Sequence, residues 1–168
     1  IQSSQNKKMR FIAACCFHYF IKYKSDLFTE DNLLEMANLF GSFIMENQNR
    51  IDSEDTSDIL VSLSELCGII PQFIEESLKM FPPEIFLILI GNLTEEISDQ
   101  YFRSKFDMNN QIDKIIDELK DTIYQYFLDT PFNIHWAKSF YQFFKHYQNP
   151  IFCIPFFDKI EMMAQDQD

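Results

Sequence analysis

Glycine is almost absent from this chain, which has three glycines and nineteen phenylalanines in 168 residues. Tight turns and close backbone approaches depend on glycine, so few of them can form. Apolar side chains recur at spacings of three and four residues along most of the chain, which is the period of one face of an α-helix. We therefore expect an all-α fold that acts through its surface rather than through a catalytic pocket.

The chain has enough apolar material for one hydrophobic core. Its hydrophobic fraction is 46% and its aromatic fraction is 16%, which excludes a disordered chain. The most apolar run, Ile85–Ile90, is too short to span a bilayer, so we expect no membrane insertion. No glycine- or serine-rich linker divides residues 1–168, which we expect to be a single helical module. The start at Ile1, with no signal-peptide core, leads us to expect an internal segment of a longer chain.

Helix-end residues divide the chain into about eight predicted helices. Thr29 is an expected N-cap, because the carboxylates of Glu30 and Asp31 would then lie in the first turn. Pro83 is expected near the start of a helix that is apolar on most sides. A buried strand over Ile85–Ile90 is the alternative, but no second strand is available to pair with it. The other predicted helices cover residues 7–23, 59–68, 71–80, 108–130, 134–147 and 150–163.

The predicted helices have inward faces and a few aromatic side chains outside them. The helix after Thr29 should bury Leu33, Ala37, Phe40 and Ile44, with Leu34, Met36, Leu39 and Phe43 widening this face. The helix over 134–147 should bury Ile134, Ala137, Phe140, Phe144 and Tyr147. Four aromatic residues fall outside the predicted stripes: Tyr124, Trp136, Tyr141 and Phe143. They either mark an interface or, as we favour, pack the next pair of helices.

Negative charge dominates most of the chain. The net charge is −12, and all five basic residues that precede Asp26 stand in a stretch without acids. The rest of the chain therefore holds 26 acids and nine bases. Such a surface repels the phosphate backbone of nucleic acids and attracts basic proteins. We expect protein partners with basic surfaces and no direct binding of nucleic acid.

No catalytic, metal-binding or cofactor motif occurs in the sequence. The glycines at positions 41, 68 and 91 are too far apart for a phosphate-binding glycine loop. The cysteines form no CxxC pair and the histidines stand apart; these residues are Cys15, Cys16, Cys67, Cys153, His18, His135 and His146. We expect no cofactor, no metal and no enzyme activity. Free thiols favour a reducing compartment, the cytoplasm and nucleus.

Two acidic sets are candidates for partner binding. Asp113, Asp117 and Asp121 are spaced four residues apart. They are expected on the side of their helix away from an isoleucine stripe, which consists of Ile112, Ile115, Ile116, Leu119, Ile123 and Phe127. Like charges at this spacing repel each other, so the set is tolerated either because solvent screens it or because a basic partner binds it. The second set is expected at the start and on the outer face of the third helix, and consists of Glu54, Asp55, Asp58 and Glu65.

Residues 33–47, LLEMANLFGSFIMEN, resemble the first helix of a degenerate HEAT repeat of the importin-β/exportin (karyopherin) superfamily. Residues 59–80 resemble the second helix and the proline-bearing link of such a repeat. The helix over 84–101 and the helix from Met108 look like another pair, so that the likeness covers about residues 7–130. It implies helical hairpins stacked as a HEAT-like α-solenoid; an irregular helical bundle is the alternative.

The resemblance also implies a function. A karyopherin-like segment would bind cargo and the small GTPase Ran, and an acidic inner surface would suit their basic patches. The candidate partner-binding residues are then Asp58, Glu65, Asp113, Asp117 and Asp121. One alternative is a scaffold or adaptor domain of another large assembly, such as a vesicle coat, RNA-processing or transcription complex. A second alternative is a helical enzyme or regulatory subunit without a recognisable motif.

Overall fold

A computed structural model describes residues 27–50, 54–98, 109–147 and 150–165, together with Met9, Ile12, Cys16, Tyr19 and Phe20. Every regular element in these ranges is helical, and no strand occurs among them, so the predicted all-α class is confirmed. The elements are α2 (Glu30–Glu46), the 3₁₀-helix η2 (Gln48–Arg50), α3 (Glu54–Ile69), α4 (Phe73–Met80), α5 (Pro83–Ser98), α7 (Asn109–Asp129), α8 (Ile134–His146) and α9 (Pro150–Gln165). Most of the helix predicted over 7–23 lies outside the described residues.

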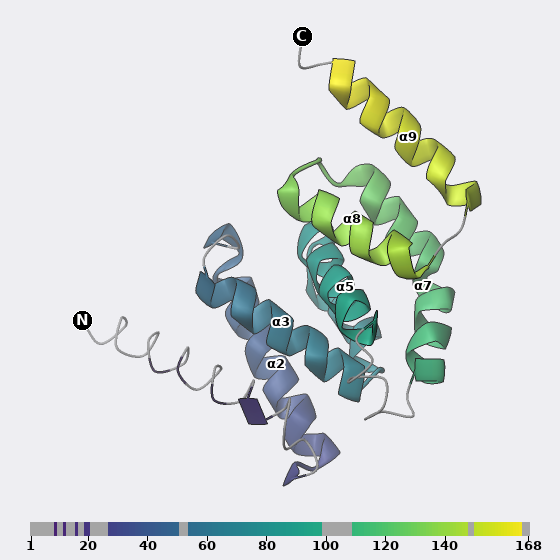
Figure 1. Cartoon of the computed structure of the whole chain (residues 1–168). Helices are drawn as coiled ribbons and strands as arrows, with labels where there is room; N and C mark the ends of the chain where they lie inside the picture. The colour runs from purple at the N-terminus through teal and green to yellow at the C-terminus, as the bar shows by residue number, and fades with distance from the viewer. Residues whose placement is uncertain are drawn as a thin grey trace.

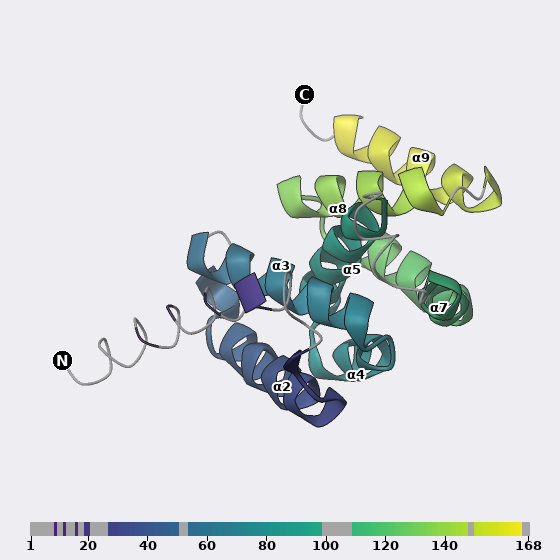
Figure 2. The same cartoon turned by 60° about the horizontal axis from the view of Figure 1, so that its bottom comes forward.

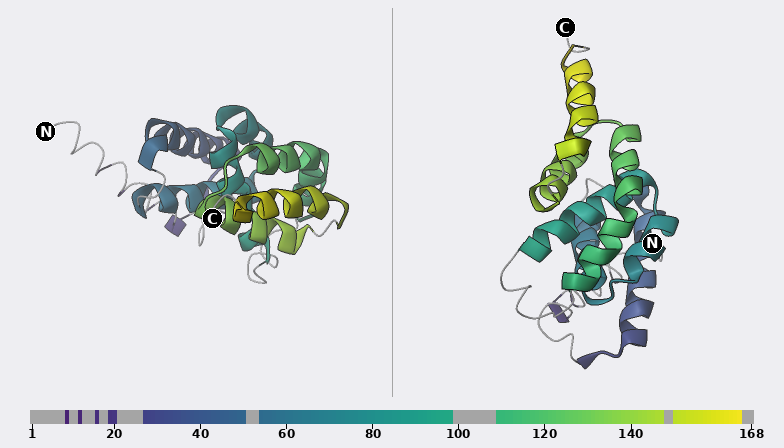
Figure 3. Two further views of the ribbon diagram at one scale, coloured as in Figure 1. Left: turned by 90° about the horizontal axis from the view of Figure 1, so that it is seen from above. Right: turned by 90° about the vertical axis from the view of Figure 1, so that its right-hand side faces the viewer.

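The helices follow one another through space in roughly the order of the chain. In Figure 1, α2 lies at one end of the molecule and α9 at the other, with α5 between them. Turning the molecule leaves α2 and α9 at opposite ends (Figure 2). The side view in Figure 3 shows α9 reaching away from the other helices.

The start of α2 is set by Thr29, as predicted. The backbone N–H of Asn32 donates to Oγ1 of Thr29 at 3.3 Å, and the N–H of Thr29 donates to Oδ1 of Asn32 at 3.4 Å. This reciprocal capping box satisfies two backbone donors that the first helical turn leaves without partners. The predicted N-terminal boundary of this helix is therefore confirmed.

The predicted inward face of α2 is mostly correct. Leu33, Met36, Ala37, Phe40 and Ile44 are buried, against α3 and α4. Their neighbours Leu34 and Phe43 are half-buried. The prediction for Leu39 is wrong, because its side chain is 58% exposed. This residue lies about 100° around the helix from Phe40, beyond the width of the face that α3 and α4 cover.

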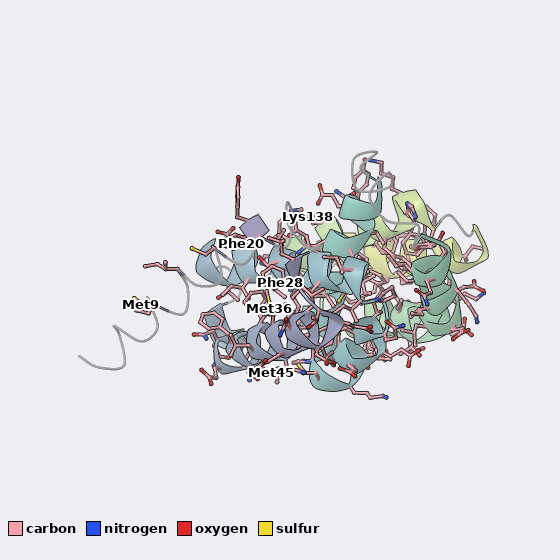
Figure 4. The ribbon with its side chains drawn as sticks, turned by 90° about the horizontal axis from the view of Figure 1, so that it is seen from below. Met9, Phe20, Phe28, Met36, Met45 and Lys138 are labelled. Carbon is pink, nitrogen blue, oxygen red and sulfur yellow. The ribbon has the colours of Figure 1, made fainter. Side chains whose placement is uncertain are left out.

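The side of the molecule around α2 is drawn with its side chains in Figure 4. Phe28, just before α2, makes an edge-to-face contact with Phe20, with ring centroids 6.4 Å apart. Met36 and Met45 both belong to α2, and each packs into or against the core. Met9 lies to the side of the helices, and its side chain is 65% exposed.

The third helix runs longer than predicted at both ends. It begins at Glu54, before the predicted start at residue 59, and ends at Ile69, one residue after the predicted end at residue 68. Cys67 lies in the second half of this helix. Its thiol is fully buried and lies 4.0 Å from the hydroxyl of Ser77 on α4. Burial raises the pKa of Cys67 to about 12, so the thiol stays neutral.

The fifth helix is the centre of the fold. It starts at Pro83, as predicted, and contacts α3, α4, α7 and α8. All residues from Ile85 to Ile90 are buried, and so is Leu93. The alternative of a buried strand over Ile85–Ile90 is wrong. A helix that is apolar on most sides needs neighbours on most sides, and four other helices supply them.

Helices α5 and α8 approach each other closely in the core. A Cβ atom added at Gly91 would lie 2.7 Å from Cα and 2.9 Å from Cβ of Ser139, closer than real Cβ contacts. The side chain of Ser139 is also buried. Two small residues at the crossing point therefore let these two helices pack at short range.

The crossing with α5 also fixes the rotation of α8, which differs from the prediction. Trp136, Ser139 and Phe143 are its buried residues, whereas Ile134, predicted to face inward, is 77% exposed. Ile134 lies about 200° around the helix from Trp136. The four other residues predicted inward are half-buried and flank the buried face: Ala137, Phe140, Phe144 and Tyr147.

Three of the four aromatic residues left outside the predicted stripes pack in the core. The exposed fraction is 5% for Tyr124, 3% for Trp136 and 0% for Phe143, and only Tyr141 is exposed. Their rings join those of Phe127 and Phe156 in one cluster, with centroids 5.7 to 6.2 Å apart. The explanation that they pack neighbouring helices is therefore correct for these three.

One lysine joins α9 to the end of α7. Nζ of Lys159 donates to the backbone carbonyls of Phe127, Leu128 and Thr130, at 2.9, 2.5 and 2.7 Å. These carbonyls are among those that a helix C-terminus leaves without partners, and a cation there also meets the negative end of the helix dipole. The same amine lies 5.4 Å from the centroid of the Trp136 ring.

The first prediction concerns the two glycines with close neighbours. Gly91→Ala should lower the free energy of unfolding by about 1 to 3 kcal/mol, because the backbone of α8 would have to move. Gly41→Ala is the matched control: its added Cβ meets the flexible end of Met80, Sδ at 2.5 Å. At this position the gain in helix propensity, up to about 1 kcal/mol, should exceed the cost of moving the Met80 side chain. Urea unfolding followed by circular dichroism measures both; equal effects of the two substitutions would contradict the close α5–α8 packing.

The second prediction concerns Lys159. Lys159→Met keeps an unbranched side chain, one atom shorter, and removes the three hydrogen bonds, so we expect a loss of about 1 to 3 kcal/mol in the free energy of unfolding. Lys138→Met, at an exposed position on α8, is the control and should change stability little. Thermal unfolding of the two variants distinguishes these outcomes, and equal midpoints would refute the role of Lys159 as a cap.

A candidate protein-binding surface on α7

Helix α7 has one buried face and one acidic face. Ile112, Ile116, Ile123 and Phe127 are buried, with exposed fractions of 2% or less. Exposed side chains lie beside this buried face, and three of them form what we call the acidic ridge: Asp113, Asp117 and Asp121. In Figures 1 and 2, α7 lies at the edge of the molecule away from α2. The isoleucine stripe anchors this helix in the core and leaves the ridge facing solvent.

Basic side chains partly neutralise the acidic ridge. Nζ of Lys120 lies 2.7 Å from Oδ1 of Asp117, three residues earlier. The hydrogen bond to Asp117, its charge and the charge of Asp121 raise the pKa of Lys120. One turn away, Lys114 lies 4.0 Å from Glu118. Exposed pairs of this kind add little to stability, so Lys120 can exchange its partner at small cost.

The first residue of the ridge is tied to the end of α8. The hydroxyl of Tyr147 donates to Oδ1 of Asp113 at 2.8 Å, and Nε2 of His146 lies 3.9 Å from the same oxygen. Burial, the hydrogen bond to Asp113 and the charge of this carboxylate all raise the pKa of Tyr147 well above its usual range. The phenol therefore stays protonated and remains a donor to Asp113.

A hollow opens beside the ridge, between α7 and α8. Its volume is about 310 Å³. Polar groups, aromatic rings and one isoleucine form its wall; the lining residues are Ile116, Asp117, Lys120, Tyr124, Phe143, His146 and Tyr147. Sequence reasoning identified Asp117 alone among these as a site residue. Lys120 could have been recognised from its spacing to Asp117, whereas Tyr147 is 34 residues from Asp113 and no sequence pattern joins them.

The acidic set predicted on α3 does not form one surface with the ridge. Asp58 is exposed as expected, but the side chain of Glu65 is 0% exposed, so its placement on an outer face is wrong. The side chains of Glu54 and Asp55 lie outside the described part of the structure. In its second half, α3 is covered by α2 on one side and α5 on another, which leaves no solvent face at Glu65. In Figures 1 and 2, α3 and α7 lie on opposite sides of α5.

Within the described residues, no group of three or more histidine, cysteine, aspartate or glutamate side chains is arranged to hold a metal ion. The described helices also include none with the length and apolar character needed to cross a membrane. The side chains of the acidic ridge and around the hollow are mainly carboxylates, basic groups and aromatic rings. Such groups bind other molecules through charge and ring contacts.

The third prediction concerns the bond between Tyr147 and Asp113. Tyr147→Phe should lower the free energy of unfolding by about 1 kcal/mol at neutral pH. Because the folded protein holds this proton more tightly than the unfolded chain, the stabilisation is complete below pH 10 and is lost as the pH rises above it. The difference in stability between the parent chain and the variant should therefore shrink above pH 10. Denaturant unfolding at several pH values measures it, with Tyr141→Phe, at an exposed position on α8, as the control. A difference that grows with pH would contradict this bond.

Comparisons with known proteins found no relative of this chain. No protein-family model, no curated protein and no solved structure matches the chain. The resemblance to the importin-β/exportin superfamily therefore stays a prediction, carried by the helical pattern of the sequence.

Proposed function

We propose that this chain is a protein-binding helical scaffold, and that the acidic ridge on α7 binds a basic segment of another protein. The observation that carries this proposal is the exposure of Asp113, Asp117 and Asp121 on successive turns of a helix whose other face is anchored in the core. A net charge of −12 attracts basic partners from a distance. The ridge then offers carboxylates at a regular spacing for lysine and arginine side chains.

We also propose that the helices are stacked hairpins of a HEAT-like α-solenoid. In support, α3 contacts α5 and α5 contacts α8, while α2 contacts α4. In such an arrangement each helical pair packs on the next. If the resemblance to karyopherins holds, the basic partner is a cargo protein or Ran, in the cytoplasm and nucleus. A scaffold domain of another large assembly would use the same surface, and a helical enzyme or regulatory subunit would need a further site.

The fourth prediction tests the ridge directly. In the variant Asp113→Asn/Asp117→Asn/Asp121→Asn, the affinity for an arginine- and lysine-rich octapeptide should fall about tenfold or more, and its dependence on salt should flatten. Stability should stay the same or rise by a few tenths of a kcal/mol, because repulsion between like charges four residues apart is removed. Fluorescence anisotropy at several salt concentrations measures binding.

The control is a variant with the same change in net charge at a distant place. Glu35, on α2, and Glu75 and Glu76, on α4, are exposed and can be replaced by glutamine together. We expect this control to retain most of the affinity. An equal loss in both variants would show attraction by net charge alone, and unchanged binding by the aspartate variant would refute the ridge as the binding surface.

A further inference from the structure

The hollow between α7 and α8 has the size of a site for one side chain. Its volume of about 310 Å³ is at the lower end of the range of small-molecule pockets. The rings of Tyr124 and Phe143 form part of its wall, and both belong to the buried aromatic cluster. They contact each other edge to face, with centroids 5.9 Å apart. Both rings are almost fully buried, and the half-buried ring of Tyr147, which also lines the hollow, is more accessible to an entering group.

The charges around the hollow favour a cation over an anion. Lys120 is held by Asp117 at 2.7 Å, and His146 lies 3.9 Å from Asp113. An incoming anion would find each of these bases already beside a carboxylate and would also meet the acidic ridge. An incoming cation meets the same carboxylates and the aromatic rings, and both attract it.

We propose that this hollow receives one arginine side chain of the basic partner. The proposal rests on the acidic ridge as the binding surface and names the residue type that the partner supplies. A guanidinium is planar, so it can stack on an aromatic ring while its edge donates two hydrogen bonds to a carboxylate. Asp117 is the acceptor at the edge of the hollow. The compact ammonium of lysine can make the charge contact but not the stacked one.

In this arrangement Lys120 competes with the incoming arginine for Asp117. Its side chain is 39% exposed and that of Asp117 is 72% exposed, so their ion pair opens at small cost. When arginine binds, the ammonium of Lys120 leaves Asp117 and turns toward solvent or toward Asp121, whose charge already acts on it. Removing Lys120 should therefore strengthen arginine binding at this site.

Two glycine–serine peptides, one with a central arginine and one with a central lysine, test the hollow. Nuclear magnetic resonance titration of the whole chain measures both affinities. The arginine peptide should bind about three- to tenfold more tightly than the lysine peptide and shift the ring signals of Tyr124 and Tyr147. Equal affinities, or shifts confined to other residues, would overturn the hollow as an arginine site.

Two matched variants test the competition. Lys120→Gln should raise the affinity for the arginine peptide about two- to fivefold. Lys114→Gln removes the same charge from the same helix and frees Glu118 instead, outside the hollow, so it should leave the affinity nearly unchanged. An equal gain in both variants, or a loss in Lys120→Gln, would overturn the proposal.

The outcomes separate this proposal from the one on which it rests. Suppose that the basic octapeptide binds the parent chain but not the triple aspartate variant, while the arginine and lysine peptides bind equally. This result would support the ridge as the binding surface and refute the hollow as an arginine site. If the octapeptide does not bind the parent chain at all, the ridge is wrong, and the arginine site falls with it.

Discussion

The burial of α5 on most of its sides is the constraint on which the rest of the structure depends. Its apolar residues from Ile85 to Leu93 can leave water only if helices pack on several faces, and α3, α4, α7 and α8 do so. Contact with α5 determines which face of each of these neighbouring helices points inward. The isoleucine stripe of α7 faces inward for this reason, and the acidic ridge faces outward as a consequence.

Hydrogen bonds from polar side chains connect the helices in the second half of the molecule. Apolar burial alone would leave the backbone carbonyls at the end of α7 without hydrogen-bond partners. The carbonyl of Phe127 accepts from Nε1 of Trp136 at 2.8 Å and from Nζ of Lys159 at 2.9 Å, so one backbone oxygen links α7, α8 and α9. At the other end of α7, Tyr147 and Asp113 join α7 to the segment after α8. The hollow lies beside the contact between Tyr147 and Asp113. Residues of both α7 and the end of α8 therefore form its walls.

Hydrophobic spacing predicted much of the fold, because each helix buries a face and capping residues mark its ends. Thr29, Pro83 and the isoleucine stripe of α7 were all predicted correctly from local patterns. The prediction failed where burial depends on a neighbour distant in the chain. Ile134 is exposed because the approach of Gly91 to Ser139 sets the rotation of α8, and Glu65 is buried because two helices cover α3. The hollow was missed for the same reason, since it joins residues of α7 to residues 19 to 31 positions further along the chain.

The short distance between α5 and α8 has an evolutionary consequence. The atom nearest to a Cβ at Gly91 is Cα of Ser139, which every amino acid possesses. Changing the side chain at position 139 cannot relieve this clash, so no compensatory substitution there would permit a larger residue at position 91. Among descendants of this chain, glycine at 91 should persist, while position 139 is free to vary among small residues.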